Sequence, residues 1–366
     1  MPVCFKDGNG APRCELIDRR ETTLTQSGCG PTFVNADSRG YYLSDYAASD
    51  LRALAKDASS LKTIEWMSLL GDEWRMVRAG RHDIDVYLDV ASALSRNDAP
   101  EILEMLEERL GEIDGTIASA DERPRFEAWV RMRFAPALTT IGLPGDPKDS
   151  DERQRLRATL LSIVGVIGND AAVQRRAREL AEAYIANPRS LSGTMAATVL
   201  RVAALRGDRE LYDQYVAQLT KTSATPELHY RFFNALPWFA DPMLARRTLE
   251  YAASPAVRSQ DAATLIGGLV ASAATSDISW EFVKTQWPAL LKRLDIFQGI
   301  PGIIESLGSL CSATRAQEIK AFFAKSPEPA ISRTLQVSLE RMDSCVALRA
   351  RQSKPFSEWL RMAGTY

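Results

Sequence analysis

The helical character of this chain is clearest in one stretch, Trp66-Met67-Ser68-Leu69-Leu70-Gly71-Asp72-Glu73-Trp74-Arg75-Met76-Val77-Arg78-Ala79-Gly80. The apolar residues that recur in it at helical spacing are Trp66, Leu69, Leu70, Trp74 and Val77. Side chains three and four residues apart lie on one face of an α-helix, so the stretch predicts an amphipathic helix with one buried side. Gly80 predicts its end, because glycine readily adopts the left-handed conformation that terminates helices.

The same spacing recurs along most of the chain after Tyr46. Further apolar stripes begin at Ile84, Ile102, Leu156, Val173, Tyr212 and Ile331. Ser150 and Asp83 stand where the N-caps of two of these helices are expected. Helix starts recur roughly every 17–20 residues, so a helix pair takes roughly 40, which is the period of HEAT and armadillo arrays. We therefore predict a mostly α fold over residues 47–366, a HEAT/armadillo-like helical superhelix of antiparallel helix pairs.

Residues 1–46 have a different pattern. Three short β-prone runs lie between glycines and prolines: Val3–Phe5, Cys14–Ile17 and Thr32–Val34. They predict a small antiparallel sheet, which would be marginally stable by itself. Either this sheet packs on the helical body, or it is the cut end of a larger β domain.

Composition and charge exclude several classes of protein. The chain has 366 residues, with 45 Lys and Arg against 47 Asp and Glu, so its net charge is −2. This balance implies neither a nucleic-acid partner nor an anionic membrane surface. No run of about 18 apolar residues occurs, so no membrane span is expected either.

Histidine is scarce, which limits the catalytic mechanisms available. The two histidines are His82 and His229, and no His-Glu-x-x-His motif occurs. His82 beside Asp83 could serve as a general base, but an exposed histidine in a turn is the simpler interpretation. His229 fits a packing role on a helix. We expect no catalytic residue and no metal site in this chain. A hydrolase that uses either histidine is kept as a further hypothesis, beside those given below.

The five cysteines leave two interpretations open. They are Cys4, Cys14, Cys29, Cys311 and Cys345, without a Cys-x-x-Cys pair. Cys4 and Cys14 flank a turn-forming segment, and Cys311 and Cys345 lie on or near predicted helices, so these two pairs are candidate disulfides. The alternative is that all five are buried free thiols. Disulfides would imply a compartment outside the cytoplasm.

Three blocks of sequence go beyond a generic helical array. The first block is Val34-Asn35-Ala36-Asp37-Ser38-Arg39-Gly40-Tyr41-Tyr42. The second is Leu70–Gly80, part of the stretch quoted above. The third is Val257-Arg258-Ser259-Gln260-Asp261, followed by Trp280-Glu281-Phe282-Val283. In this order and spacing they resemble the C-terminal half of aminopeptidase N-like zinc metallopeptidases, a group that includes the endoplasmic-reticulum aminopeptidases. The resemblance covers essentially the whole chain. One departure is Leu43, which stands where the family usually has arginine after Gly-Tyr-Tyr.

The resemblance implies a division of labour. Residues 1–46 would be the end of a β-sandwich domain, and residues 47–366 the C-terminal helical superhelix. Zinc would lie in a separate catalytic domain of the parent enzyme, with no cofactor in this chain. This chain would then be a non-catalytic module that caps the active-site cavity and contacts the peptide substrate during release of its N-terminal residue. Its partners would be the catalytic domain, in the same chain or a separate one, and peptides.

The resemblance also suggests particular residues. In relatives, the loop containing Gln298, Gly299 and Ile300 faces the active site, which suggests a substrate contact; the alternative is an ordinary turn between helices. Arg258 and Gln260 are expected to fix helix packing. A second hypothesis for the whole chain is a stand-alone helical scaffold that binds peptides or proteins without peptidase activity. The parent enzyme could be periplasmic, secreted or cytoplasmic.

Overall fold

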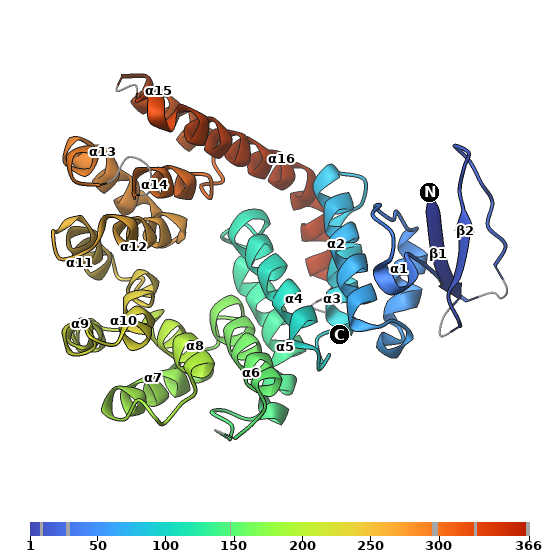
Figure 1. Ribbon diagram of the computed structural model, residues 1–366, viewed down its shortest axis with the longest axis horizontal. Coiled ribbons are helices and arrows are strands. Elements are labelled where there is room, and N and C mark those ends of the chain that lie inside the picture. Colours follow the sequence, from blue (N-terminus) through green and yellow to red (C-terminus); the bar gives the residue numbers. More distant parts are fainter. Residues whose placement is uncertain (8–9, 27–29, 147, 295–298, 326–327, 364–366) are drawn as a thin grey trace. The chain divides into compact units, whose positions relative to one another are not determined.

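The computed structural model describes residues 1–7, 10–26, 30–146, 148–294, 299–325 and 328–363 (Figure 1). The chain divides into two compact units. The first unit consists of Met1–Leu143, Ser150–Ile163 and Arg351–Tyr366, and the second of Pro144–Asp149 and Val164–Ala350. Strands and helices share the first unit, and the domain boundary predicted at residue 46 stays a prediction.

The first unit begins with a three-stranded antiparallel sheet of order β2-β1-β3. The strands are β1 (Pro2–Asp7), β2 (Arg13–Leu16) and β3 (Thr32–Val34), so all three predicted runs form strands. In the register, Cys4 of β1 lies opposite Cys14 of β2, and Phe5 lies opposite Val34 of β3. Strand β1 is buried from Val3 to Lys6, whereas every residue of β2 is exposed. The sheet therefore has a buried centre and an exposed edge strand.

The helices of the first unit follow the predicted apolar stripes. They are α1 (Ala48–Ala55), α2 (Thr63–Ala79), α3 (Ile84–Ala93), α4 (Pro100–Glu112), α5 (Arg123–Ile141) and α6 (Asp151–Ser162), with short helical turns η1 (Ala36–Ser38), η2 (Ala58–Ser60) and η3 (Ile113–Ile117). Helix α2 packs on α3 and α4, and α6 packs on α4 and α5. The five stripe residues of α2 are all at most 3% exposed, because this face is turned toward its neighbours. The core of the unit is thus built from the stripes.

All regular elements among the described residues of the second unit are helices. Its elements are η4 (Ile163–Ile167), α7 (Ala171–Ala186), α8 (Gly193–Ala204), α9 (Arg209–Lys221), α10 (Pro226–Phe233), η5 (Leu236–Trp238), α11 (Pro242–Ala253), α12 (Ser259–Ala271), α13 (Ser276–Arg293), α14 (Gly299–Leu307), α15 (Ala313–Lys325), η6 (Pro329–Ile331) and most of α16 (Ser332–Ala363). Helices close in the chain pack together, as in α7 with α8, α9 with α10, and α12 with both α11 and α14. Short connections favour such antiparallel neighbours.

These elements confirm the predicted fold class, a mostly α protein that begins with a small antiparallel sheet. Gly80 ends α2 in the left-handed conformation with φ 72°, as predicted. The Ser150 side chain caps α6 by accepting a hydrogen bond from the Arg153 amide. Asp83 stands at the N-cap of α3 but makes no capping bond with its side chain. None of the helices in the described ranges is long and apolar enough to cross a membrane.

Candidate functional site

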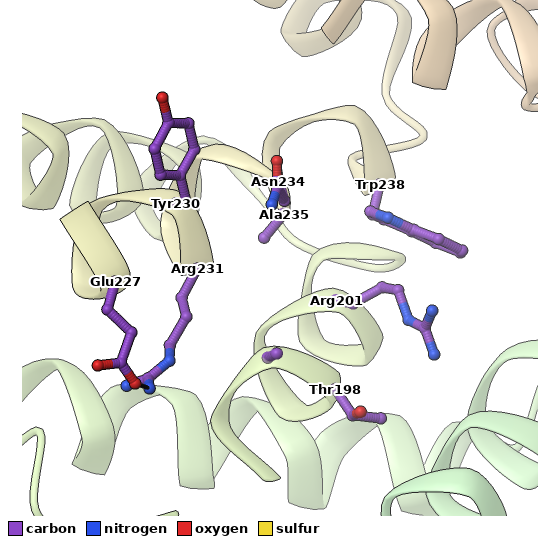
Figure 2. A pocket seen from close by; sticks show the side chains of 9 residues that line it. Thr198, Arg201, Glu227, Tyr230, Arg231, Asn234, Ala235 and Trp238 are labelled. Atoms are coloured by element: carbon purple, nitrogen blue, oxygen red, sulfur yellow. Dashed lines mark hydrogen bonds and ion pairs between the residues drawn. The ribbon is translucent and has the colours of Figure 1, made fainter. Parts of the chain in front are cut away.

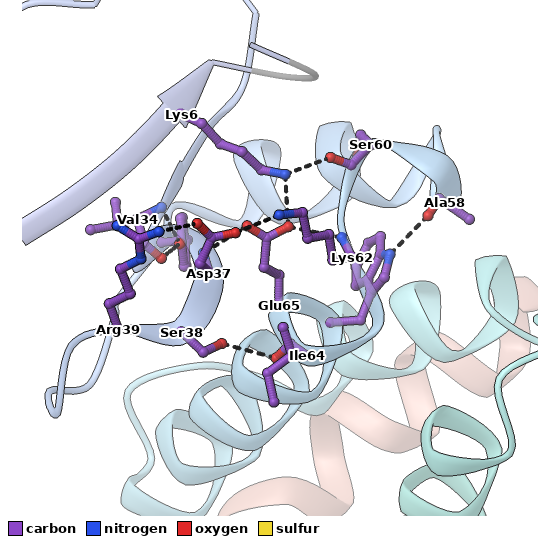
Figure 3. Close-up of polar contacts among 12 residues, drawn as sticks. Lys6, Val34, Asp37, Ser38, Arg39, Ala58, Ser60, Lys62, Ile64 and Glu65 are labelled. Atoms are coloured by element: carbon purple, nitrogen blue, oxygen red, sulfur yellow. Dashed lines mark hydrogen bonds and ion pairs between the residues drawn. The ribbon is translucent and has the colours of Figure 1, made fainter. Parts of the chain in front are cut away.

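A buried ion pair fastens the sheet to the helices of the first unit (Figure 3). Lys6 Nζ donates to Glu65 Oε2 at 2.7 Å and to the Ser60 carbonyl at 3.0 Å. Glu65 also accepts from the backbone amides of Asp37 at 3.0 Å and Lys62 at 2.8 Å. Burial raises the pKa of Glu65, but these donors lower it by more, so that its pKa lies below the ordinary value. The carboxylate therefore remains charged inside the protein and joins β1 to the first turn of α2.

Asn35 and Gly40 of the first sequence block close a tight loop next to this anchor. The Asn35 side chain accepts from the Gly40 amide at 2.6 Å and donates to the Gly40 carbonyl at 3.1 Å. Asn35 has φ 79°, a left-handed conformation that asparagine tolerates better than most residues. A Cβ on Gly40 would lie 1.9 Å from the Tyr42 ring. Asn35 thus suits the left-handed backbone and Gly40 the close approach of the Tyr42 ring, so both have a structural role.

The tyrosines of this block differ in their surroundings. Tyr41 is fully exposed, whereas Tyr42 is half-buried against Gly40, and burial raises the pKa of Tyr42. Leu43, at the position where the resemblance leads one to expect arginine, is 52% exposed. The exposed apolar side chains of the N-terminal segment thus include Met1, Leu16, Tyr41 and Leu43.

His82 lies between two carboxylates in the turn between α2 and α3. Its Nδ1 is 2.7 Å from Glu73 Oε2 and its Nε2 is 2.9 Å from Asp45 Oδ1. The side chains of His82 and Glu73 are 16% and 3% exposed, so the expected exposed turn histidine is half-buried instead. With both nitrogens engaged, neither is left to take a proton from a substrate, which argues against His82 as a general base. The sequence did not reveal this cluster, because Asp45 is 37 residues away.

His229 has the packing role that its sequence context predicted. Its Nδ1 lies 3.1 Å from the Leu219 carbonyl, and its ring stacks on Phe233 with centroids 5.8 Å apart. The second unit therefore uses its histidine to join α9 and α10.

A cavity of about 460 Å³ opens beside α10 in the second unit (Figure 2). We call it the Arg201 pocket; its lining residues are Ala197, Thr198, Arg201, Glu227, Tyr230, Arg231, Asn234, Ala235 and Trp238. They come from α8, from α10 and the residues after it, and from η5. Phe232, Phe233 and Phe239 are core residues, whereas Trp238 is half-buried and lines the pocket.

Two guanidinium groups determine the polarity of the Arg201 pocket. Arg231 donates to the Tyr184 hydroxyl at 2.7 Å and pairs with Glu227. Arg201 lies over the Trp238 ring, 4.8 Å from its centroid. Guanidinium groups bind carboxylates and carbonyl oxygens, an aromatic wall accepts apolar side chains, and the Asn234 amide can pair with a peptide group. This combination has the chemistry to hold a segment of peptide.

Asp261, in the last of the three sequence blocks, contacts a residue that lines the Arg201 pocket. Asp261 of α12 accepts a hydrogen bond from the Tyr230 hydroxyl at 2.9 Å, and this bond raises the pKa of Tyr230. Arg258 and Gln260 are exposed at the start of α12. Asp261 therefore joins α12 to α10.

The loop suggested as a substrate contact is only partly described. Gln298 lies outside the described residues, and its contact with substrate stays a prediction. Gly299 and Ile300 begin α14, which packs on α12. Ile300 is fully buried, and a Cβ on Gly299 would lie 2.8 Å from Ser259 Oγ.

Both candidate cysteine pairs are bonded in the structure. Cys4 is joined to Cys14 across the β1–β2 pair, and Cys311, in the segment before α15, is joined to Cys345 of α16. Each unit thus contains one of these disulfides.

The described residues include no cluster suited to zinc. Across the described ranges, no group of three or more His, Cys, Asp or Glu residues is arranged to hold a metal ion. His82 belongs to the first unit and is bound on both nitrogens by carboxylates, whereas His229 belongs to the second. Zinc ligation by histidine needs a free ring nitrogen.

Comparison with known families places these two units in a recognised class, the C-terminal domains of aminopeptidases. Residues 32–344 match the family model described as the ERAP1-like C-terminal domain, and the chain belongs to this family. The match includes all three sequence blocks, which confirms the resemblance that they suggested.

The relatives are aminopeptidases from several kingdoms. The chain is 22% identical to the mitochondrial aminopeptidase 2 of Saccharomyces cerevisiae over 375 residues, which covers 100% of the chain. It is 23% identical to aminopeptidase M1 of Arabidopsis thaliana over 86% of the chain, and 24% identical to endoplasmic reticulum aminopeptidase 2 of Bos taurus over 79%. The matched regions are 39%, 36% and 31% of these relatives' own lengths. The chain therefore spans well under half of each relative.

Proposed function

We propose that this chain is the non-catalytic C-terminal module of a zinc aminopeptidase. The observation that carries the proposal is the match of residues 32–344 to the ERAP1-like C-terminal domain, in a chain equivalent to 31–39% of the lengths of those three aminopeptidases. Zinc and the general base would belong to a catalytic domain in the same polypeptide or in a separate chain. This module would cap the cavity of that domain and bind the part of the peptide that follows the reacting end.

The exposed edge of the sheet supports attachment to further protein. Strand β2 is exposed along its length, and Leu16 at its end is 72% exposed. An edge strand with free backbone groups is a template for pairing with another strand. A strand from the rest of the enzyme would bury this edge.

The Arg201 pocket is our candidate for the peptide contact. A carboxylate or carbonyl group of the peptide would bind the guanidinium of Arg201, which lies over the Trp238 ring. The Asn234 amide would pair with the peptide backbone, and Tyr230, held by Asp261, would define one wall. Gln298 remains a further candidate for contact with substrate.

The second candidate function is a stand-alone scaffold that binds peptides or proteins without peptidase activity. It is favoured by the composition of the Arg201 pocket, because every lining residue belongs to the second unit. Such a pocket needs no other domain to form. Under this alternative the protein would be complete in function without zinc.

The test of the proposal is the size and activity of the protein in its own cells. An antibody against the helical part should detect, on a reducing denaturing gel, a band well above 40.5 kDa or a partner chain that co-purifies. The purified 366-residue chain should not hydrolyse aminoacyl-coumarin substrates, with or without added zinc. A lone 40.5 kDa protein without an enzymatic partner would favour the scaffold, and zinc-dependent turnover by the chain itself would contradict both candidates.

The pocket assignment has a separate test. Binding of fluorescein-labelled nonapeptides to the purified chain should weaken about tenfold in Arg201→Ala, a loss of about 1.4 kcal/mol. The matched control is Arg209→Ala, because Arg209 lies on neighbouring α9 with a side chain that is 84% exposed. Equal affinity in wild type and Arg201→Ala would remove the Arg201 pocket from the proposal while leaving the module assignment unaffected.

A further inference from the structure

The hydrogen bonds around His82 require a particular protonation state. Nδ1 faces Glu73 Oε2 at 2.7 Å and Nε2 faces Asp45 Oδ1 at 2.9 Å. An ionised carboxylate can only accept hydrogen bonds, so both nitrogens must carry a proton to make both contacts. In the neutral ring, one nitrogen would present a lone pair to a carboxylate oxygen at the same distance. The geometry therefore fits an imidazolium between two carboxylates.

The surroundings of this cluster are rich in carboxylates. The charged groups around it are Asp72, Glu73 and Arg75 on α2, Arg81 in the turn, Asp45 before α1 and Asp85 on α3. Asp85 is held by Arg52 of α1 at 2.7 Å, and Arg81 pairs with Asp45. From the C-terminal part of α16, the uncharged Gln352 amide donates to the His82 carbonyl at 3.0 Å, while Arg351 binds the Arg78 carbonyl at 2.7 Å. The protonated His82 is the positive charge that lies between Glu73 and Asp45.

Asp45 belongs to a short linker, residues 44–46, that joins the sheet segment to α1. Each residue of the linker has a different anchor: the Ser44 amide donates to Asp72 at 2.9 Å, and Asp45 contacts His82 and Arg81. The Tyr46 hydroxyl accepts from the Val34 amide at 2.8 Å and donates to the Val34 carbonyl at 3.0 Å. Of these anchors, His82 is the group whose ordinary pKa lies near neutral pH.

We propose that His82 is a proton-operated latch that holds the linker against the α2–α3 turn. With its proton bound, His82 connects Asp45 of the linker to Glu73 of α2. When the proton leaves at higher pH, the neutral ring keeps one N–H and can donate to only one of the two carboxylates, so the bridge between Asp45 and Glu73 is broken and the linker loosens. The Lys6–Glu65 anchor holds β1 on α2 independently, so the joint between sheet and helices becomes more flexible without coming apart. This inference goes beyond the proposed aminopeptidase role and does not depend on it.

The direction of the pH effect follows from the two partners. Burial lowers the pKa of His82, but the Glu73 and Asp45 carboxylates raise it by more, so it lies above its ordinary value of about 6.5. Burial raises the pKa of Glu73 as well. The folded cluster thus holds more protons than the unfolded chain. Its stabilising contribution is complete below the unfolded histidine pKa and is lost as pH rises through the folded pKa.

Nuclear magnetic resonance can test the latch directly, because the chain has only two histidines. In protein with ¹³C-labelled histidine, His229→Gln assigns the remaining ring signal to His82. We expect the His82 signal to titrate above about pH 6.5, and its midpoint to fall by about one unit in Asp45→Asn. A midpoint at or below 6.5 in the wild type, or no change in Asp45→Asn, would overturn the proposal.

Hydrogen exchange tests the mechanical part. The protection factor of the Ser44 amide, which donates to Asp72, should fall about tenfold between pH 6 and pH 9 in the wild type and in His229→Gln. In Asp45→Asn it should be low at both pH values, because the linker side of the latch is missing. The amides of β1, held through Lys6 and Glu65, should keep their protection throughout. Linker protection that is independent of pH in the wild type would show that His82 is only a structural residue.

Discussion

At the scale of single residues, the most consequential interaction is the buried pair of Lys6 and Glu65. Their side chains are 7% and 0% exposed. The desolvation cost of such a pair is offset only while both partners and their hydrogen bonds are present. Removing one partner leaves an uncompensated charge in the interior, which costs far more than losing an ion pair at the surface.

We therefore expect Lys6→Met to destabilise the first unit by about 3 kcal/mol. Urea unfolding measures the change, with Lys62→Met as the control, because Lys62 Nζ also pairs with a carboxylate, Asp37, but its side chain is 65% exposed. The control should change stability little. Since the pKa of Glu65 is lowered in the folded state, the contribution of the anchor should be present above the unfolded pKa of about 4.3 and lost as pH falls through the folded value. Equal effects of the two substitutions would contradict this account.

At the scale of elements, helix α2 joins the main features of the first unit. Its first turn binds the sheet through Glu65, its middle carries the buried stripe, and its last residues lead into the His82 turn. Two glycines, one inside this helix and one directly after it, differ in backbone conformation and in the space available for a side chain. Gly71 lies in the helix interior, where an added Cβ would meet open space, whereas Gly80 has φ 72° and would place a Cβ 2.7 Å from Arg351 Cδ.

Alanine at these two positions should have effects of opposite sign. Gly71→Ala should stabilise the protein by about 0.5–1 kcal/mol, because alanine loses less conformational freedom in a helix. Gly80→Ala should destabilise it by about 1–2 kcal/mol, because alanine is strained in the left-handed region. Thermal unfolding of the two variants beside the wild type measures both. A Gly80→Ala variant as stable as the wild type would mean that α2 can end without the left-handed residue.

At the scale of the whole molecule, the chain is two compact units, each with its own disulfide. The Cys4–Cys14 bond closes a separation of 10 residues and the Cys311–Cys345 bond one of 34. A cross-link stabilises mainly by restricting the unfolded chain, and the restriction grows with the length of the closed segment. Persistent disulfides are a property of proteins in oxidising compartments.

Loss of the longer cross-link should therefore be the more damaging. We expect about 4 kcal/mol for Cys345→Ser and about 3 kcal/mol for Cys14→Ser, from calorimetric unfolding in which the two units are followed separately. Peptide mapping without reductant should first recover the two linked pairs from protein isolated from its own cells. Recovery of these cysteines as free thiols would contradict both the stabilisation and an oxidising compartment.

Much of the fold was predictable because its signals are local. Helical stripes such as Trp66–Val77, the strand runs of residues 1–34 and the glycine that ends α2 depend on residues within about one helical turn or one strand of each other. The family resemblance was also readable, because its blocks keep their order along the chain.

The sites depended on contacts that no local pattern contains. Lys6 meets Glu65 across 59 residues, Asp45 meets His82 across 37, and the Arg201 pocket combines side chains of α8, α10 and η5. Periodicity states which face of a helix is buried, but not which neighbour covers it or which charges then meet. The sequence by itself thus determined the elements and the family, and only the tertiary structure decided the anchor, the histidine cluster and the pocket, because the free energy of buried charges depends on partners brought together by packing.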